Sequence, residues 1–376
     1  MADDTTGRQD AGATGATDVR VLEVERAALG TTRLVGEPLG ELAPGEVRLR
    51  IDRFALTANT ITYAAMGDML GYWGFYPAAL PWGRVPAMGW ADVVASANPE
   101  IEVGGRYFGW YPMATSVDVL VVPSTDGMRD QGEHRLQHAA VYRSFTETTK
   151  DESYAPGGDA EDRHALLRGL FATGYLADAF FADEDYYGAD DIVVLSASSK
   201  TAIGFAQRAA TRGRRTIGVT SARNADFVRS VGFYDLVVTY DDLGSLGGDG
   251  RTAVAVDMAG DAGVLAQVHE RYDDRLRWSM QIGMSHHDAP PAEISTGPTP
   301  KLFFAPTEVA RRAQEWGRDE YQARLGAALA AFVQGSESWL TVQRVHGEAA
   351  AQQAWAEVLG GAVAPEFGVI VSLHDA

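Results

Sequence analysis

Apolar and polar positions alternate along much of the first third of the chain, from residue 19 to residue 122. Val47, Leu49 and Ile51 alternate with arginines directly after the Pro-Gly turn at residues 43–46. An alternation with a period of two is typical of a half-buried β-strand. Because several such short segments follow one another between turns that contain glycine or proline, this part of the chain predicts a β-barrel-like domain.

The pattern changes after residue 160. Residues 165–181 have the periodicity of an amphipathic helix. Beyond them, short apolar runs alternate with segments of helix length, and the runs are residues 192–195, 216–220, 236–239, 253–256 and 276–282. Strands that alternate with helices predict a parallel, doubly wound α/β sheet. Residues 307–340 are mostly helical in pattern, and the chain closes with a helix, a turn and a strand.

One strand–turn–helix pattern stands out, at residues 190–204. The apolar run 192–195 is followed by the sequence SASSKT and then by a helical pattern. The start of such a helix presents unpaired N–H groups and a positive dipole end, which is where parallel α/β sheets hold phosphates. The dinucleotide fingerprint G-x-G-x-x-G keeps only its last glycine, Gly204, with Ser199 and Thr201 at the first two positions. The alternative is an ordinary βα turn that binds nothing.

Composition restricts the class of protein. The chain has 376 residues, enough for two domains, and its net charge of −19 argues against nucleic acid or an anionic membrane as partner. There is no cysteine, which excludes disulfides, thiolate nucleophiles and cysteine-ligated zinc. No apolar run has membrane-spanning length, and residues 1–18 predict a disordered tail rather than a secretory signal. We therefore expect a cytoplasmic protein.

The order of several segments carries a resemblance. PGEVRLRIDRFALTANTITYAAMGD, RVPAMGWADVVASANPEIEVGGRYFGW and SVDVLVVP, followed by the strand–turn–helix, resemble the medium-chain dehydrogenase/reductase superfamily. The chain is most similar to the zinc-free quinone oxidoreductase and enoyl reductase branch, and it resembles an uncharacterised bacterial domain-of-unknown-function sub-branch whose phosphate turn reads S-S-K-T. The resemblance implies a GroES-like β-barrel catalytic domain at residues 19–160 and 306–376, and a Rossmann cofactor-binding domain at residues 161–305. The family's usual lysine after the last turn glycine is Val369 here.

The end of the second Rossmann strand indicates which nicotinamide cofactor to expect. An Asp or Glu there would bind the ribose 2′-OH and select NAD, but residues 220–224 contain neither. Arg223 can instead make a charge-assisted bond to a 2′-phosphate and Ser221 can donate to it, as the matching positions do in NADPH enzymes of the family. Lys200 adds a second cation near the phosphates. We therefore expect NADPH; the alternative is a solvated arginine behind a serine N-cap.

Further cofactor-binding candidates follow from the turn and from the resemblance. Tyr240 resembles the family's tyrosine after strand three, near the adenosine. The residues after strands four and five should meet the nicotinamide because they lie at the carboxyl ends of strands, although each glycine there can equally be a tight turn. The predicted cofactor-binding residues are Ser198, Ser199, Lys200, Thr201, Ser221, Arg223, Tyr240, Ala259, Gly260, Gly283 and Met284.

The barrel half supplies the catalytic and substrate-binding candidates. Asn59, Thr62 and Tyr63 follow the second barrel strand, in a segment that borders the cleft in the family. Asn59 can donate to a carbonyl oxygen and Tyr63 can donate a proton, although Tyr63 can also be plain aromatic core. The predicted substrate residues are Tyr72, Trp73, Tyr76, Trp82 and Tyr142, and the first four can equally be packing in a long loop. Residues 131–158 favour an acidic surface excursion, and the alternative places Tyr142 in the substrate cleft.

Hydride transfer without zinc is the chemistry that these candidates favour. His286 and His287 are adjacent and point in opposite directions in an extended chain, so we expect no metal. We expect an NADPH-dependent oxidoreductase that reduces an activated C=C bond in a quinone, enone or enoyl substrate. The alternatives are a carbonyl reductase or alcohol dehydrogenase, and a fold relative with weak or no cofactor binding that acts as a non-redox enzyme or binding protein. The expected partner is a small molecule, with no nucleic acid and no membrane, and the family usually forms a homodimer through the Rossmann sheet edge.

Overall fold

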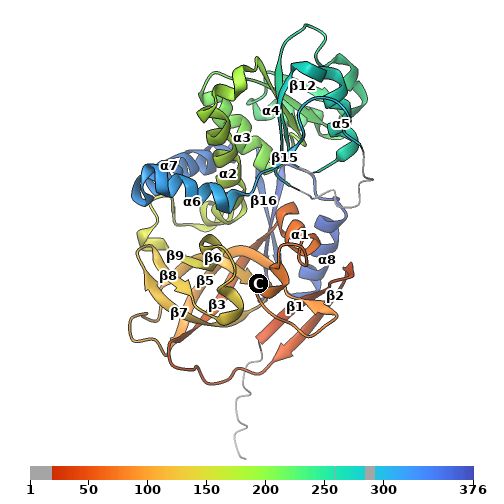
Figure 1. Cartoon of the computed structure of the whole chain (residues 1–376). Helices are drawn as coiled ribbons and strands as arrows, with labels where there is room; N and C mark the ends of the chain where they lie inside the picture. Colours follow the sequence, from red (N-terminus) through yellow and green to blue (C-terminus); the bar gives the residue numbers. More distant parts are fainter. Residues whose placement is uncertain (1–18, 259, 284–292) are drawn as a thin grey trace, which may run out of the picture.

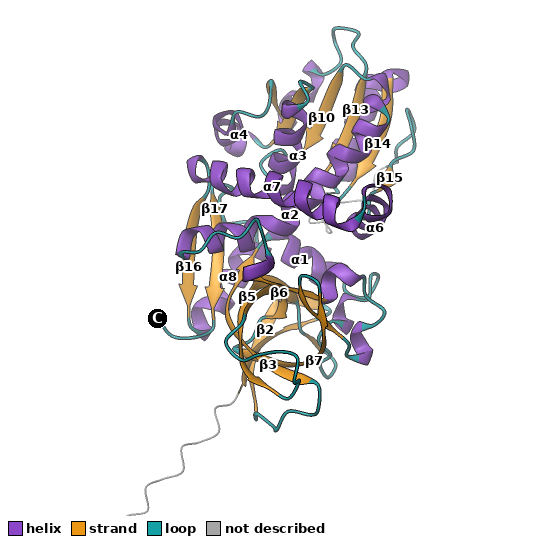
Figure 2. Ribbon diagram, turned by 90° about the vertical axis from the view of Figure 1, so that its left-hand side faces the viewer, coloured by secondary structure: helices purple, strands orange, loops and turns teal. Residues whose placement is uncertain are grey.

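The computed structural model describes residues 19–258, 260–283 and 293–376, which form two halves (Figures 1 and 2). The lower half in Figure 1 is a β-barrel built from the red-to-yellow part of the chain, and the upper half is a parallel α/β sheet built mainly from the green and teal part. The last helix and strands return to the barrel, so both ends of the described chain belong to the lower half.

The barrel is a closed antiparallel sheet. Its strands, in order, are β3 (Glu46–Leu56), β5 (Pro86–Ser96), β6 (Arg106–Pro112), β9 (Ser144–Glu147), β8 (Gly127–Asp130) and β7 (Ser116–Ser124), and β7 pairs with β3 to close the circle. Val47, Leu49 and Ile51 on β3 are at most 1% exposed, which explains their alternation with arginines. The strands that extend or flank the barrel are β17 (Phe367–Ser372), β16 (Thr341–His346), β1 (Val19–Glu25), β2 (Ala28–Glu37) and β4 (Trp82–Gly83).

The upper half is a parallel sheet whose strand order reverses near its middle. The order is β12 (Leu236–Thr239), β11 (Arg215–Thr220), β10 (Asp191–Leu195), β13 (Ala253–Asp257), β14 (Leu276–Gln281) and β15 (Lys301–Leu302). All of these strands except β15 match the predicted apolar runs within one residue at each end. The helices after β10, β11 and β13 are α3 (Lys200–Thr211), α4 (Ala225–Val231) and α5 (Ala262–Tyr272). Because the chain leaves β10 and β13 toward opposite edges, a ligand crevice is expected at their carboxyl ends.

Helix α2 (Gly158–Asp183) joins the two halves. Its start lies against the barrel, and its later turns pack on α3, on α6 (Ala305–Trp316) and on α7 (Arg318–Gly335) (Figure 1). A Cβ on Gly174 would lie 2.7 Å from the backbone nitrogen of Phe205, so glycine permits this close approach of α2 to α3. Among the described helices, α2 is long and apolar enough to cross a membrane, but 67% of that window is buried inside the protein, as in a core helix.

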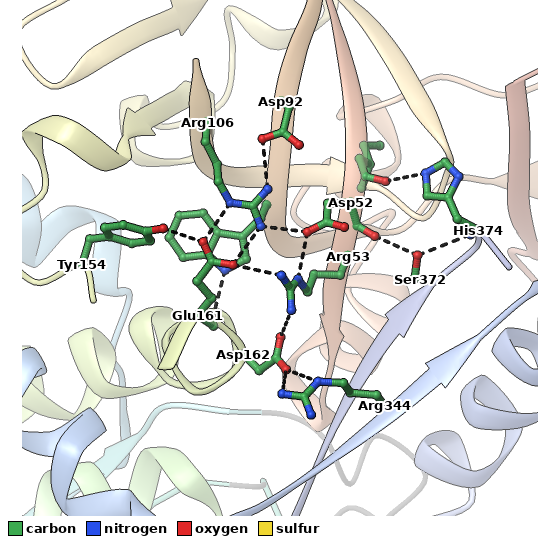
Figure 3. Close-up of polar contacts among 12 residues, drawn as sticks. Asp52, Arg53, Asp92, Arg106, Tyr154, Glu161, Asp162, Arg344, Ser372 and His374 are labelled. Atoms are coloured by element: carbon green, nitrogen blue, oxygen red, sulfur yellow. Dashed lines mark hydrogen bonds and ion pairs between the residues drawn. The ribbon is translucent and has the colours of Figure 1, made fainter. Parts of the chain in front are cut away.

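An ion-pair network fixes the start of α2 on the barrel (Figure 3). Glu161 accepts hydrogen bonds from Arg53 of β3 at 2.9 Å and from Arg106 of β6 at 2.8 and 2.9 Å. Asp162 accepts from Arg53 at 2.8 Å and from Arg344 of β16 at 2.6 Å. The Glu161 and Asp162 side chains are 7% and 0% exposed, so the arginines supply the counter-charges that burial requires.

The surface excursion predicted for residues 131–158 is wrong for Ser144–Glu147, which form β9. This strand pairs with both β6 and β8, and its Phe145 is 1% exposed, so β9 completes the barrel wall. The strand is too short for an alternation to be recognised in the sequence. The predicted domain boundaries at residues 160 and 306 fall near the starts of α2 and α6, and they stay a prediction.

Candidate functional site

A cavity of about 680 Å³ lies between the two halves. The turns after β10, β11 and β12 form one wall. The opposite wall is formed by α1 (Ala58–Ala65), β6 and the segment before β9, while α2 and the segment before β17 close the sides. Because open α/β sheets bind ligands in the crevice at the switch of strand order, this cavity is the candidate site.

The turn after β10 is rich in residues with hydroxyl side chains. Ser196 has a left-handed φ of 54°, a conformation that costs a non-glycine residue about 1–2 kcal/mol. Its Oγ lies 3.3 Å from the hydroxyl oxygen of Tyr240, which also lines the cavity. Ser199 is the N-cap of α3, where its Oγ accepts a hydrogen bond from the backbone N–H of Ala202 at 3.2 Å. Ser198 and Thr201 line the cavity beside this helix start, whose dipole attracts anions.

Lys200 has partners within the protein. Its Nζ donates to the backbone carbonyls of Phe367 at 2.8 Å and Pro365 at 3.3 Å, and thereby ties the chain before β17 to the start of α3. Burial lowers the pKa of this amine to about 8. Lys200 therefore lines the cavity as a cation anchored to backbone carbonyls, and it reaches a phosphate only if it leaves them.

The segment after β11 presents two polar groups to the cavity. The Ser221 Oγ is buried and has no hydrogen-bond partner among the described residues. Arg223 is exposed, and its guanidinium makes one long bond, of 3.4 Å, to the carbonyl of Gly361. Asn224 donates to the Ser198 Oγ at 3.1 Å and so links this segment to the turn after β10. A phosphate monoester placed here would satisfy both the hydroxyl and the guanidinium.

The predicted residues after strands four and five are only partly described. Gly283 lines the cavity, together with Met258. Gly260 does not; its N–H donates to the Asp257 Oδ1 at 3.0 Å in the turn after β13. Ala259 and Met284 lie outside the described residues, as do His286 and His287.

The catalytic candidates lie at the barrel end of the cavity, on α1. The Trp110 Nε1 donates to the hydroxyl oxygen of Tyr63 at 3.0 Å, which leaves the Tyr63 O–H able to donate elsewhere. Burial raises the pKa of Tyr63, so the phenol stays protonated at neutral pH. Asn59 also lines the cavity. The Thr62 hydroxyl donates back to the carbonyl of Ala58 at 3.2 Å, so its proton is used within the helix.

Tyr72 and Tyr142 complete an aromatic cluster with Tyr63. Their hydroxyl oxygens lie 3.4 Å apart, and the Tyr63 ring centroid is 5.1 Å from that of Tyr72 and 6.2 Å from that of Tyr142. Trp110, on β6, packs edge-on against Tyr142 at 5.5 Å. The side chains of Tyr63, Tyr72, Tyr142 and Trp110 line the cavity, which therefore has aromatic walls at this end.

Three other aromatic candidates, Trp73, Tyr76 and Trp82, do not line the cavity. Trp73 fills the space over Gly67 and Gly83, where an added Cβ would lie 2.2 and 2.3 Å from its ring. Tyr76 is buried and donates to the carbonyl of Trp110 at 2.6 Å. Trp82 lies on β4, with the Arg33 guanidinium 4.2 Å above its ring. These three residues therefore pack within their loop, the alternative expected from the sequence, because the loop folds back on the barrel.

Several cavity residues were not among the sequence candidates. Trp110 lies within an alternating strand, and nothing in that pattern distinguishes a core tryptophan from one that lines a cavity. Arg129 on β8 and Arg168 on α2 also line the cavity, far apart in the sequence. Across the described part of the chain, no group of three His, Asp or Glu side chains is arranged to hold a metal ion, and the prediction on metal stays a prediction.

The family of the chain is identified by a model that matches most of its length. The model described as "Protein of unknown function (DUF2855)" matches residues 54–364. This agrees with the predicted resemblance to an uncharacterised sub-branch of the superfamily. No curated protein matches the chain in sequence.

Solved structures share the fold at low sequence identity. CurA from Vibrio vulnificus in complex with NADPH gives a TM-score of 0.63 at 14% identity, over 95% of this chain and 100% of that chain. The yhdH oxidoreductase from Salmonella enterica in complex with NADP gives 0.54 at 17% identity, over 94% and 99%. A quinone oxidoreductase from Pseudomonas syringae pv. Tomato DC3000 gives 0.57 at 13% identity, over 94% and 99%. These likenesses confirm the predicted fold, a GroES-like barrel with a Rossmann sheet.

Proposed function

The chain belongs to the family described as Protein of unknown function (DUF2855), and we propose that it is an NADPH-dependent oxidoreductase that reduces an activated carbon–carbon double bond. The observation that carries the proposal is the pair of groups after β11, the buried hydroxyl of Ser221 without a partner in the described chain and the exposed guanidinium of Arg223. A 2′-phosphate satisfies both, and residues 220–224 contain no carboxylate to bind a plain ribose. The NADPH and NADP in the CurA and yhdH structures support the same choice.

The cavity residues fit the other parts of the cofactor. The start of α3 offers a positive dipole end to the diphosphate, between Ser198 and Thr201. Lys200 adds a positive charge beside it, since its pKa of about 8 keeps most of it protonated at neutral pH. Tyr240, half-buried beside Ser196, presents an aromatic side chain on the adenosine side. The nicotinamide would then lie toward Met258 and Gly283, below which the aromatic cluster begins.

The reaction needs one hydride and one proton. When bound, NADPH supplies a hydride to the β-carbon of the substrate. The C=C electron pair moves toward the activating carbonyl, and one proton is added at the α-carbon, so that alkene, NADPH and a proton give the saturated product and NADP. Tyr63 is suited to hold that proton, because Trp110 donates to its oxygen and burial keeps the phenol protonated. Asn59 is suited to donate to the carbonyl oxygen, where negative charge develops.

The substrate end of the cavity favours a flat, apolar acceptor. Tyr63, Tyr72, Tyr142 and Trp110 present aromatic surface there, and such walls exclude water from the reacting bond. A quinone, an enone or an enoyl compound matches these walls.

One observation favours a second candidate, a relative of the fold that binds no nicotinamide cofactor. The Ser199 Oγ and the Lys200 Nζ, which stand in the phosphate turn, both bond to backbone groups of the protein itself. In that case the cavity would serve a non-redox enzyme or a binding protein.

Product analysis with 4-phenylbut-3-en-2-one separates these candidates. We expect NADPH consumption with formation of the saturated ketone. Formation of the unsaturated alcohol would indicate carbonyl reduction instead. No consumption, together with no binding of NADPH, would leave the second candidate.

We also propose that the chain forms a homodimer through the edge of the parallel sheet. Leu302 on the edge strand β15 is 66% exposed, and Phe304 beside it is 40% exposed. A monomeric mass in light scattering at micromolar concentration would contradict this assignment.

A further inference from the structure

The cavity carries more positive charge than the chain as a whole. The chain has a net charge of −19, yet the charged side chains among the described residues that line the cavity are Asp126, Arg129, Arg168, Lys200, Arg223 and Arg318. Lys200 and Arg223 belong to the proposed cofactor end. The other three arginines lie on β8, α2 and α7, away from the turns assigned to the cofactor. We call the part of the cavity lined by these arginines and by Thr146 of β9 the Arg129 branch. A cleft lined by one sign of charge concentrates ligands of the opposite sign.

Two arginines of this branch have acidic partners. Arg318 at the start of α7 donates to Asp126 at 2.6 Å. Arg168 on α2 donates to Asp151 and lies 3.0 Å from the His164 Nε2. Within the described part of the chain, the other terminal nitrogen of Arg168 makes one contact, of 3.5 Å, to the Thr146 Oγ1. Arg168 therefore keeps donor capacity that faces the cavity.

Arg129 on β8 has no ion pair and no side-chain hydrogen bond within the described chain. It is half-buried, and its Nε is buried without an acceptor. The two acids nearest to it in sequence have other basic partners, because Asp126 binds Arg318 and Asp130 lies 3.6 Å from Arg135. A guanidinium has five N–H donors, and a buried N–H without an acceptor, as at the Arg129 Nε, is unfavourable. Arg129 thus lacks an anion that a bound ligand can provide.

The branch lies next to the aromatic cluster. The Arg168 guanidinium is 4.7 Å from the Phe108 ring, and Phe108 is 5.7 Å from Trp110, whose N–H bonds to Tyr63. Arg129 pairs across the sheet with Ser144, two residues after Tyr142. Direct contacts therefore connect the arginines of the branch to the Tyr63 hydroxyl through Phe108 and Trp110.

We propose that the Arg129 branch binds a carboxylate of the substrate, so that the substrate is an acid whose activated double bond lies a few bonds from the carboxylate. A carboxylate matches the planar fork of one guanidinium in a bidentate pair, and its single negative charge balances that of Arg129, which has no ion pair among the described residues. The Thr146 hydroxyl, which accepts the contact from Arg168, can donate to the same carboxylate. This inference rests on the proposed function, since it names the class of substrate for the same cavity.

A pair of substrates tests the inference. The probes are 4-(3-oxobut-1-enyl)benzoic acid and its methyl ester, which share the enone and the ring. Their acid group stands on the far side of the ring from the double bond, so the two probes differ mainly in charge. We expect the wild-type enzyme to reduce the acid with a kcat/KM at least about 10-fold above that of the ester, from a charge-assisted bond. Arg129→Gln should lower kcat/KM for the acid by about 10- to 100-fold and change that for the ester by less than about 2-fold. Arg129→Lys keeps the charge but loses the planar fork of the guanidinium. Its kcat/KM for the acid should lie between those of the wild type and of Arg129→Gln.

A binding measurement tests the role of Arg129 in carboxylate binding independently of turnover. Calorimetry with 4-(3-oxobutyl)benzoic acid, the saturated product, should show binding to the wild-type protein and the loss of that binding in Arg129→Gln. The exposed Arg229→Gln on α4 is the matched control and should leave both readouts unchanged. Equal reduction of acid and ester by the wild type, or binding of the acid that does not depend on Arg129, would overturn the inference while the NADPH reductase stands. Failure of the reductase itself would appear separately, as no NADPH binding.

Discussion

Replacing Ser221 with alanine should move folding stability and NADPH affinity in opposite directions. The Ser221 Oγ is buried and finds no hydrogen-bond partner in the described part of the chain. An unsatisfied buried polar group costs about 1–3 kcal/mol, so Ser221→Ala should raise the free energy of unfolding by about 1 kcal/mol. Most substitutions destabilise, and a gain would therefore be informative. The physical reason is that the Ser221 hydroxyl forms its hydrogen bond with a bound ligand and contributes none to the folded protein alone.

The NADPH affinity of the same variant should fall. A hydrogen bond to a charged group contributes about 1.5–3 kcal/mol, so loss of the bond to the 2′-phosphate should raise the Kd for NADPH by about 10- to 100-fold. NADH lacks this phosphate, and its Kd should change by less than about 2-fold.

Urea unfolding without ligand and calorimetric titration measure the two effects. Ser198→Ala is the matched control for stability, because the Ser198 Oγ accepts a hydrogen bond from Asn224 and its loss leaves that amide without a partner. The control should therefore lower the unfolding free energy by about 1 kcal/mol. A loss of stability in Ser221→Ala, or equal weakening of NADPH and NADH, would refute the reasoning.

Other substitutions have effects of known direction. Tyr63→Phe should lower kcat by about 100-fold through loss of the proton donor, and full turnover would exclude that role. Glu161→Gln should cost about 1.5–3 kcal/mol in urea unfolding, because Arg53 and Arg106 each lose a charged partner and keep, among the described residues, only Asp52, Asp92 and Asp162. The exposed Glu320→Gln should change the unfolding free energy little. Burial lowers the pKa of His164 from 6.5 to about 3, so the unfolded chain binds the extra proton and stability should fall between pH 6.5 and 3. His164→Gln should flatten that pH slope, and an unchanged slope would contradict the assignment.

Much of the fold can be predicted from the sequence, because a strand or helix that is buried in the core needs apolar residues at regular positions along the chain. The runs at residues 192–195 and 253–256 are buried on both faces, and β10 and β13 match them within a residue. β9 leaves no such pattern, since four residues are too few and its pairing partners lie elsewhere in the chain. Strand pairing across the barrel therefore had to come from the structure.

The candidate site could be predicted only where polar side chains come directly after the end of a strand. Ser221 and Arg223 come directly after β11, so their position followed from the order of the elements. Trp73 and Trp82 are aromatic residues of the same loop as Tyr72, and the sequence does not distinguish them from it. The fold of the loop directs both tryptophans away from the cavity. Arg129 was not predictable, because its lack of a partner depends on where every nearby carboxylate points.

Calorimetric titration of the wild-type protein with NADPH and with NADH is the most direct test of the proposed NADPH specificity. The groups after β11 predict that NADPH binds at least about 10-fold more tightly than NADH, and that Arg223→Ala removes most of the difference. Equal affinity for the two nucleotides, or no binding of either, would contradict the account.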